Sequence, residues 1–190
     1  MIDWVGSIPS EGVNRLELIE VYKSDLQRYS MEQLRHVPQH GGWSLGQMYH
    51  HLIAAALDYL DQVELCISAS EEQVGGKTEA GEQLYAAGAF PQVKIKLPEG
   101  YGDAPSNSES KDDLRRGLDL VLKRMSECEK SVHAASPNCK VQHGGFGWLN
   151  SREWFDLIGM HFRHHLRQKS ELEQHLEACM EMDHPKRGGV

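Results

Sequence analysis

Residues 150–180 read NSREWFDLIGMHFRHHLRQKSELEQHLEACM and have the apolar periodicity of one long helix. Asn150 can cap the first turn, and Glu153, three residues later, completes a capping box. One face of this helix collects large apolar side chains together with imidazoles: Trp154, Ile158, His161, His165, Leu172, Leu176 and Cys179. The segment therefore predicts a long helix whose histidines lie on the side that faces a core.

Three earlier segments have the same helical periodicity. They run from about Glu11 to Tyr29, from Ser44 to about Ser68, and from about Lys111 to Val132. Ser44 is a good N-cap for the second of them. Four amphipathic helices without an internal repeat predict an all-α protein folded as a four-helix bundle.

A connection rich in Gly and Pro, residues 70–110, joins the second and third helices. Inside it, Val93–Leu97 alternates apolar and polar residues, which predicts a short extended segment. Connections of this length in a compact domain are usually functional or cover part of the surface. Residues 70–110 are therefore either a lid over a pocket, with Phe90 and Tyr101 in its wall, or a solvated linker.

Composition limits the domain organisation and the partners. The chain of 190 residues fits one domain, which we expect to span 1–182, with 183–190 as a disordered tail. Lys and Arg number 20 against 28 Asp and Glu, and no basic run forms a phosphate-binding surface. We therefore expect neither nucleic acid nor an anionic membrane as a partner. The longest apolar run, Leu52–Leu57, is too short to cross a bilayer.

The cysteines and the start of the chain indicate a cytoplasmic protein. Residues 1–4 show no charged and apolar regions of a signal peptide. The four cysteines are scattered without C-x-x-C pairing, which argues against a disulfide framework or a cysteine zinc site. Cys66 and Cys179 fall on apolar helix stripes, so we expect both in the core.

His161 and His165 are four residues apart, which places them on one helix face about one turn apart. At ~100° per residue, His161 and Gln168 lie within ~20° of the middle of the apolar face, and His165 lies ~40° from it. His164 lies ~60° to the other side. Burying these polar side chains without partners is costly, so they need hydrogen bonds or a metal ion.

A third ligand has to come from another helix, and the second helix offers His50 and His51. His51 lies beside the apolar stripe of that helix, whereas His50 points to nearly the opposite side, so His51 is the better candidate. His36 and His40 are also four residues apart, but Pro38 between them breaks a regular helix. We expect these two histidines in a surface loop.

Spacing alone does not separate a metal site from a buried polar network, because H-x-x-x-H is a common coincidence. The network would join His161, His165 and Gln168 with Asp58, which lies two turns beyond His51 on the same side of its helix. Both interpretations stay open at this point.

Two motifs resemble those of the DinB/YfiT-like superfamily of metal-dependent bundles. Residues 43–47, Trp-Ser-Leu-Gly-Gln, followed by His51, are similar to the second-helix signature, in which a histidine stands eight residues after the tryptophan of a W-S dipeptide. Residues 145–149, 153–154 and 161–168 resemble one uncharacterised branch, which reads F-G-x-L…E-W…H-x-x-H-H-L-x-Q. The resemblance extends from the first helix to about Gln174, and the two signatures together are fairly specific.

This resemblance implies a four-helix bundle with a long crossover and one divalent ion on His51, His161 and His165. Nickel or zinc is the expected metal, with manganese or iron as the alternatives. Some relatives are thiol-dependent S-transferases or isomerases, so a small electrophilic substrate and a low-molecular-weight thiol are the implied partners, and a homodimer is a further expectation. Leu166 and Arg167 stand where many members carry Arg-Gly, which separates this chain from the better-known branches.

Three imidazoles leave at least one coordination position of the ion open. Zinc at such a site lowers the pKa of a bound water from 15.7 to ~7 or deprotonates a thiol, which gives hydrolysis or S-transfer. Gln168 and His164 would support the ligands, and Asp58 is the nearest acidic candidate for a general base unless it is a solvated carboxylate. A deep pocket beside the histidines would favour an enzyme. A binding bundle without turnover and a metal-free polar core are the alternatives.

Overall fold

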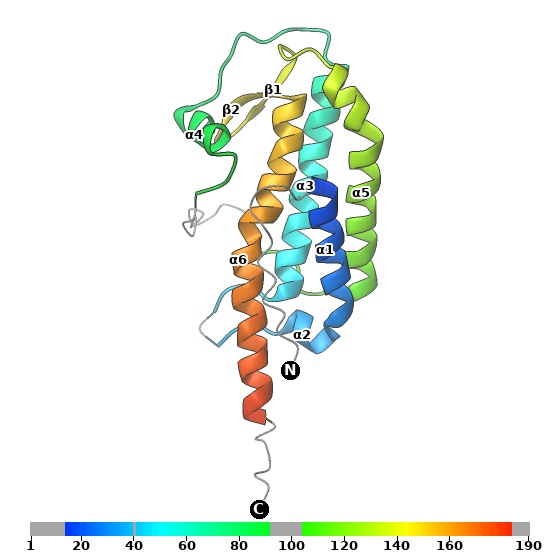
Figure 1. The fold of residues 1–190 in the computed structure, drawn as a ribbon, viewed down its shortest axis with the longest axis vertical. Helices are drawn as coiled ribbons and strands as arrows, with labels where there is room; N and C mark the ends of the chain where they lie inside the picture. Colours follow the sequence, from blue (N-terminus) through cyan, green and yellow to red (C-terminus); the bar gives the residue numbers. More distant parts are fainter. Residues whose placement is uncertain (1–13, 40, 92–103, 184–190) are drawn as a thin grey trace, which may run out of the picture.

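The computed structural model describes residues 14–39, 41–91 and 104–183, which form a bundle of long helices with a small hairpin at one end (Figure 1). Its elements are α1 (Arg15–Arg28), α2 (Met31–Arg35), α3 (Leu45–Ser68), α4 (Glu79–Ala87), α5 (Lys111–Ala134), β1 (Lys140–His143), β2 (Gly147–Asn150) and α6 (Ser151–Asp183). The predicted all-α bundle is confirmed, with a two-stranded sheet added to it.

The four long helices pack around the bundle in the order α1, α5, α3, α6, so that α3 contacts both α5 and α6. Figure 1 shows α3 and α5 running in the same direction, opposite to α1 and α6. Two consecutive parallel helices need a long return connection, because a short loop can join only antiparallel neighbours. The crossover between α3 and α5 follows from this arrangement and was predicted.

Side-chain caps begin the two helices that carry the histidines. Ser44 and Gln47 exchange hydrogen bonds at the start of α3, with donor–acceptor distances of 3.0 and 3.1 Å. Asn150 and Glu153 make the same reciprocal pair before α6, at 2.8 and 3.1 Å. Each pair satisfies two backbone N–H groups that a helix start leaves unbonded, so both predicted caps are confirmed.

Helical periodicity does not predict α2, α4 or the hairpin of β1 and β2. The helix α4 lies inside the 70–110 connection, after the Thr78 cap, and ends at Gly88 with φ +62°. The strands pair antiparallel, with Lys140 opposite Asn150. Several expectations lie outside the described residues: the start of the first helix at 11–13, His40, the extended segment 93–97, Tyr101 and the tail from 184.

The described part of the connection packs against the hairpin and the first turn of α6. Thr78 donates from its backbone N to the carbonyl of Phe146 at 3.0 Å. The Lys77 ammonium lies 2.5 Å from the Glu153 carboxylate, and the Tyr85 hydroxyl donates to the Glu153 carbonyl at 2.7 Å. Residues 70–91 are thus anchored to the bundle, which contradicts a solvated linker over that part of the connection.

A buried aromatic cluster joins three of the long helices beside the histidines. Tyr22 of α1 donates from its hydroxyl to the carbonyl of Phe162 in α6, and Tyr49 of α3 donates to the carbonyl of Tyr22, both at 2.9 Å. Tyr49 and Phe162 stand two residues and one residue from His51 and His161 in the chain. The best-packed part of the core therefore fixes the backbone of α3 and α6 at the site. Across the described residues, every helix is too short or too polar to span a membrane.

Candidate metal centre

His51 of α3 meets His161 and His165 of α6 in the middle of the bundle. The His161 Nε2 atom lies 3.1 Å from Nε2 of His51 and 3.2 Å from Nε2 of His165. In a tetrahedral site with metal–nitrogen bonds of 2.0–2.1 Å, neighbouring nitrogens are about 3.4 Å apart. The three imidazoles are therefore spaced as ligands of a single ion are.

Burial keeps these imidazoles neutral. His161 and His165 are each 8% exposed, and His51 is partly buried. Burial lowers the pKa of all three, well below the usual value for His161 and to about 4 for His165, and each protonated ring would also repel its neighbours. A neutral imidazole has a free lone pair, which is the form that binds a metal.

Gln168 fixes the orientation of the His165 ring. Its side-chain Oε1 lies 2.6 Å from His165 Nδ1. An amide oxygen can only accept, so Nδ1 carries the proton and donates, and the Nε2 lone pair points into the cluster. Gln168 was predicted as a supporting residue, and its side chain contacts the His165 ring.

Aromatic side chains form the wall around the three imidazoles. Trp43 lies against His51, with ring centroids 5.0 Å apart. Tyr59 and Phe90 lie against His161, at 5.9 and 5.7 Å. Burial raises the pKa of Tyr59 to about 12, so its hydroxyl stays protonated. Phe90 was expected in the wall of a pocket, whereas helical phase assigned no such position to Trp43 or Tyr59.

Of the two remaining predicted residues, His164 borders the cluster and Asp58 is exposed. The His164 ring lies 5.2 Å from the His165 ring and 5.3 Å from Phe90, so it borders the cluster. Asp58 is exposed, and its charge acts on Tyr59 and His143. The exposure of Asp58 supports a solvated carboxylate over a general base at the three imidazoles.

A cavity of about 130 Å³ lies next to residues that contact the cluster. Trp43 and Gln168, which contact His51 and His165, line this cavity together with His175, whereas none of the three clustered histidines lines it. The remaining lining residues among those described are Pro38, Gly41, Gly42, Glu171 and Leu172. Pockets that enclose drug-sized ligands are about 300–1,000 Å³, so this one suits a small molecule or a few waters.

Comparison with known proteins places the same residues in a family context. A family model described as the DinB superfamily matches residues 20–168, a range that includes His51, His161 and His165. The uncharacterized protein YuaE of Bacillus subtilis (strain 168) is 25% identical to this chain over 154 residues, which cover 81% of this chain and 91% of that protein. No solved structure matches the chain.

Proposed function

The chain belongs to the DinB superfamily, and from this membership we propose that His51, His161 and His165 hold one divalent transition metal ion in a reactive site. The observation that carries the proposal is the convergence of three Nε2 atoms, at 3.1 and 3.2 Å, from two helices whose residues His51 and His161 are 110 positions apart in sequence. A helix repeat alone can align His161 with His165, but His51 joins them only through tertiary packing.

The ligand set favours zinc or nickel. Imidazole nitrogen suits both metals, and the described residues around the cluster offer it no carboxylate, which manganese would favour. Such an ion supplies Lewis acidity, which lowers the pKa of a water or a thiol next to it. With three protein ligands, one position stays open for that molecule.

The protein's own groups orient the ligands and confine the reactants. Gln168 holds the His165 ring with its Nε2 lone pair directed inward. Trp43, Tyr59 and Phe90 restrict water around the cluster, which strengthens electrostatic interactions inside it. We propose that the site activates water or a low-molecular-weight thiol toward a small electrophile, and that the reaction is hydrolysis or S-transfer.

A second function is a bundle that binds a metal ion or a small molecule without turnover. The cavity of about 130 Å³ favours this alternative, because it suits only a small molecule and none of the three histidines lines it. The two functions share the metal site and differ in whether the bound molecule is converted.

Metal content measured by plasma mass spectrometry on the untagged protein tests the site. We expect His51→Ala, His161→Ala and His165→Ala each to lose about one equivalent of metal relative to the parent, after reconstitution with zinc or nickel. His50→Ala is the matched control, since His50 lies on the same helix but faces Glu109 at 4.0 Å. Equal metal content in the parent and all three variants would overturn the site.

Activity separates the two functions. The metal-loaded parent and the chelator-treated parent are compared for hydrolysis of activated esters and for transfer of a small thiol to an electrophile. Metal-dependent turnover that is lost in His161→Ala supports the enzyme, whereas a loaded site without turnover across both reaction types supports the binding bundle.

A further inference from the structure

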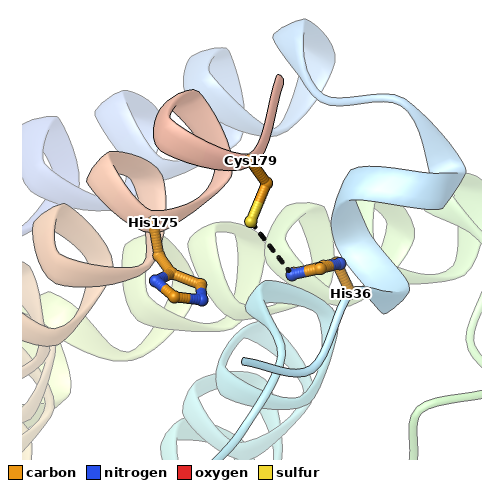
Figure 2. Close-up of side chains that lie close together, drawn as sticks. All are labelled: His36, His175 and Cys179. Carbon is orange, nitrogen blue, oxygen red and sulfur yellow. Dashed lines mark hydrogen bonds between the residues drawn. The ribbon is translucent and has the colours of Figure 1, made fainter. Parts of the chain in front are cut away.

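A second group of metal-ligand side chains lies farther along α6, towards its C-terminal end. Figure 2 shows His175 and Cys179 of α6 and His36, which follows α2, pointing into the space between the two helices. The ligand atoms of the three side chains all lie within 4.8 Å of one another. The Cys179 Sγ atom is 3.9 Å from Nε2 of His36, and the rings of His36 and His175 are 6.1 Å apart.

The fold explains why these three residues meet. His175 and Cys179 are four residues apart on α6, so they lie on one face one turn from each other. Leu34 buries α2 against the bundle, and His36 leaves the helix with extended backbone, at φ −65° and ψ 119°. This places His36 beside α6, where it is partly buried. His36 lies outside the helices, as expected for a loop residue, and its side chain is partly exposed.

Cys179 also departs from the sequence expectation. Cys66, Cys128 and Cys139 are buried, whereas Cys179 is partly exposed and next to an imidazole. The apolar stripe of α6 predicted a core position for Cys179, but the helix has by then passed the best-packed part of the bundle. A partly exposed thiol can exchange its proton and a metal ion with solvent, unlike a thiol sealed in a core.

We propose that His36, His175 and Cys179 form a second transition metal site, one for zinc. One thiolate and two imidazoles are ligands that zinc commonly takes. Coordination forms a sulfur–metal bond and releases the thiol proton to solvent, without oxidation or reduction. Tetrahedral zinc with these ligands has sulfur–nitrogen separations of about 3.5 Å, so the 3.9 Å pair needs only a small side-chain movement.

The second site would tie α2 to the C-terminal part of α6. His175 also lines the 130 Å³ cavity, together with Trp43 and Gln168, which contact the first cluster. The cavity therefore lies between residues that contact the first cluster and a residue of the second. His175 and Cys179 lie beyond residue 168, outside the family match, so this site stands or falls independently of the proposed function.

Cobalt titration of the reduced full-length protein distinguishes the two sites. A thiolate ligand to cobalt gives a sulfur-to-metal charge-transfer band in the near ultraviolet, which a site of three imidazoles lacks. We expect this band to saturate at two cobalt ions per chain in the parent, in which both sites fill, and at one in His51→Ala. It should be lost in Cys179→Ser and strongly weakened in His36→Ala and His175→Ala, and zinc should displace it.

Cys128→Ser is the matched control, because Cys128 donates to the carbonyl of Met125 and serine can do the same. It should keep the charge-transfer band. Circular dichroism confirms that each variant is folded. A parent without the band, or a band that survives Cys179→Ser in folded protein, would overturn the second site. Cobalt absorption that is lost in His51→Ala and kept in Cys179→Ser would assign the bound cobalt to the first cluster and would also overturn the second site.

Discussion

The two ligand clusters on α6 use the same i, i+4 spacing in different surroundings. His161 and His165 face α3 inside the bundle, and their Nε2 atoms are 3.2 Å apart before any ion is considered. His175 and Cys179 face a residue that follows a helix of five residues, and the Cys179 Sγ and His36 Nε2 atoms there are 3.9 Å apart. Packing preorganises the first cluster, whereas an ion has to draw the second one together.

This difference predicts how much of the free energy of metal binding each cluster uses to order its side chains. At the first cluster the long helices already hold the imidazoles, so metal affinity is not reduced by ordering. At the second cluster part of the affinity is used to order partly exposed side chains.

Removal of a first-cluster ligand should have the largest effect. In a Cys179→Ser background, zinc at 1,000 times its dissociation constant should raise the free energy of unfolding by about 4 kcal/mol, because the ion binds only the folded protein. The additional change His161→Ala should remove this gain, and His50→Ala should retain it. Urea unfolding with and without zinc measures both. An undiminished gain in the His161 variant would remove the distinction between the clusters.

Acidification should destabilise the metal-free protein through the first cluster. Burial lowers the pKa of His165 to about 4, so between about pH 6.5 and 4 the unfolded chain binds more protons than the folded one. The contribution of the neutral, buried His165 to the free energy of unfolding is complete above pH 6.5. It is lost as the pH falls towards 4, and this loss is on the order of 3 kcal/mol.

Urea unfolding with a chelator over this pH range measures the effect. His165→Asn, which does not titrate, should show a shallower decline than the parent, and the difference isolates His165 from the carboxylates. Parallel declines in the two proteins would contradict the role of burial.

Gln168→Ala should weaken metal binding at the first cluster by about 10- to 100-fold, because it frees the His165 ring. The sulfur-to-cobalt band of the second cluster should keep its midpoint. Gln174→Ala is the matched control, an exposed glutamine of the same helix. Cobalt titration followed in the visible region measures the first cluster. An equal loss at both clusters would indicate that the cavity between them couples the two.

The smallest effect is expected at the second cluster without metal. Cys179→Ser should change the free energy of unfolding by no more than about 0.5 kcal/mol in chelator, since the side chain is partly exposed. Thermal and urea unfolding of the parent and the variant measure this. A loss of about 2 kcal/mol would show that the cluster contributes through packing alone.

The long helices and the first cluster could be predicted because both depend on the helical spacing of apolar residues and histidines in the sequence. Helical phase selected His51 over His50, and the structure agrees: His51 joins the cluster, whereas His50 lies near Glu109. The capping pairs at Ser44 and Asn150 are local, so sequence suffices for them.

What could not be predicted depends on contacts between segments distant in sequence. The helix α2 has five residues, too few to show a period. The hairpin turns at residues 144–146, and Gly147, which begins β2, has φ +80° and a position where a Cβ would lie 2.7 Å from the Gly76 carbonyl oxygen. Asp58 was predicted on the same side of its helix as His51, but α3 is exposed at that position. His36 and Cys179 are 143 residues apart in sequence, so no local sequence pattern could predict their contact.

The order of synthesis adds a consequence to the position of α6 in the chain. This last long helix carries two of the three residues of each cluster and the Phe162 carbonyl that receives the Tyr22 hydroxyl. Until the ribosome has released residues 151–183, the faces of α1 and α3 that pack against α6 have no partner. Neither metal site can exist on the nascent chain before that moment, so metal loading has to follow the synthesis of α6.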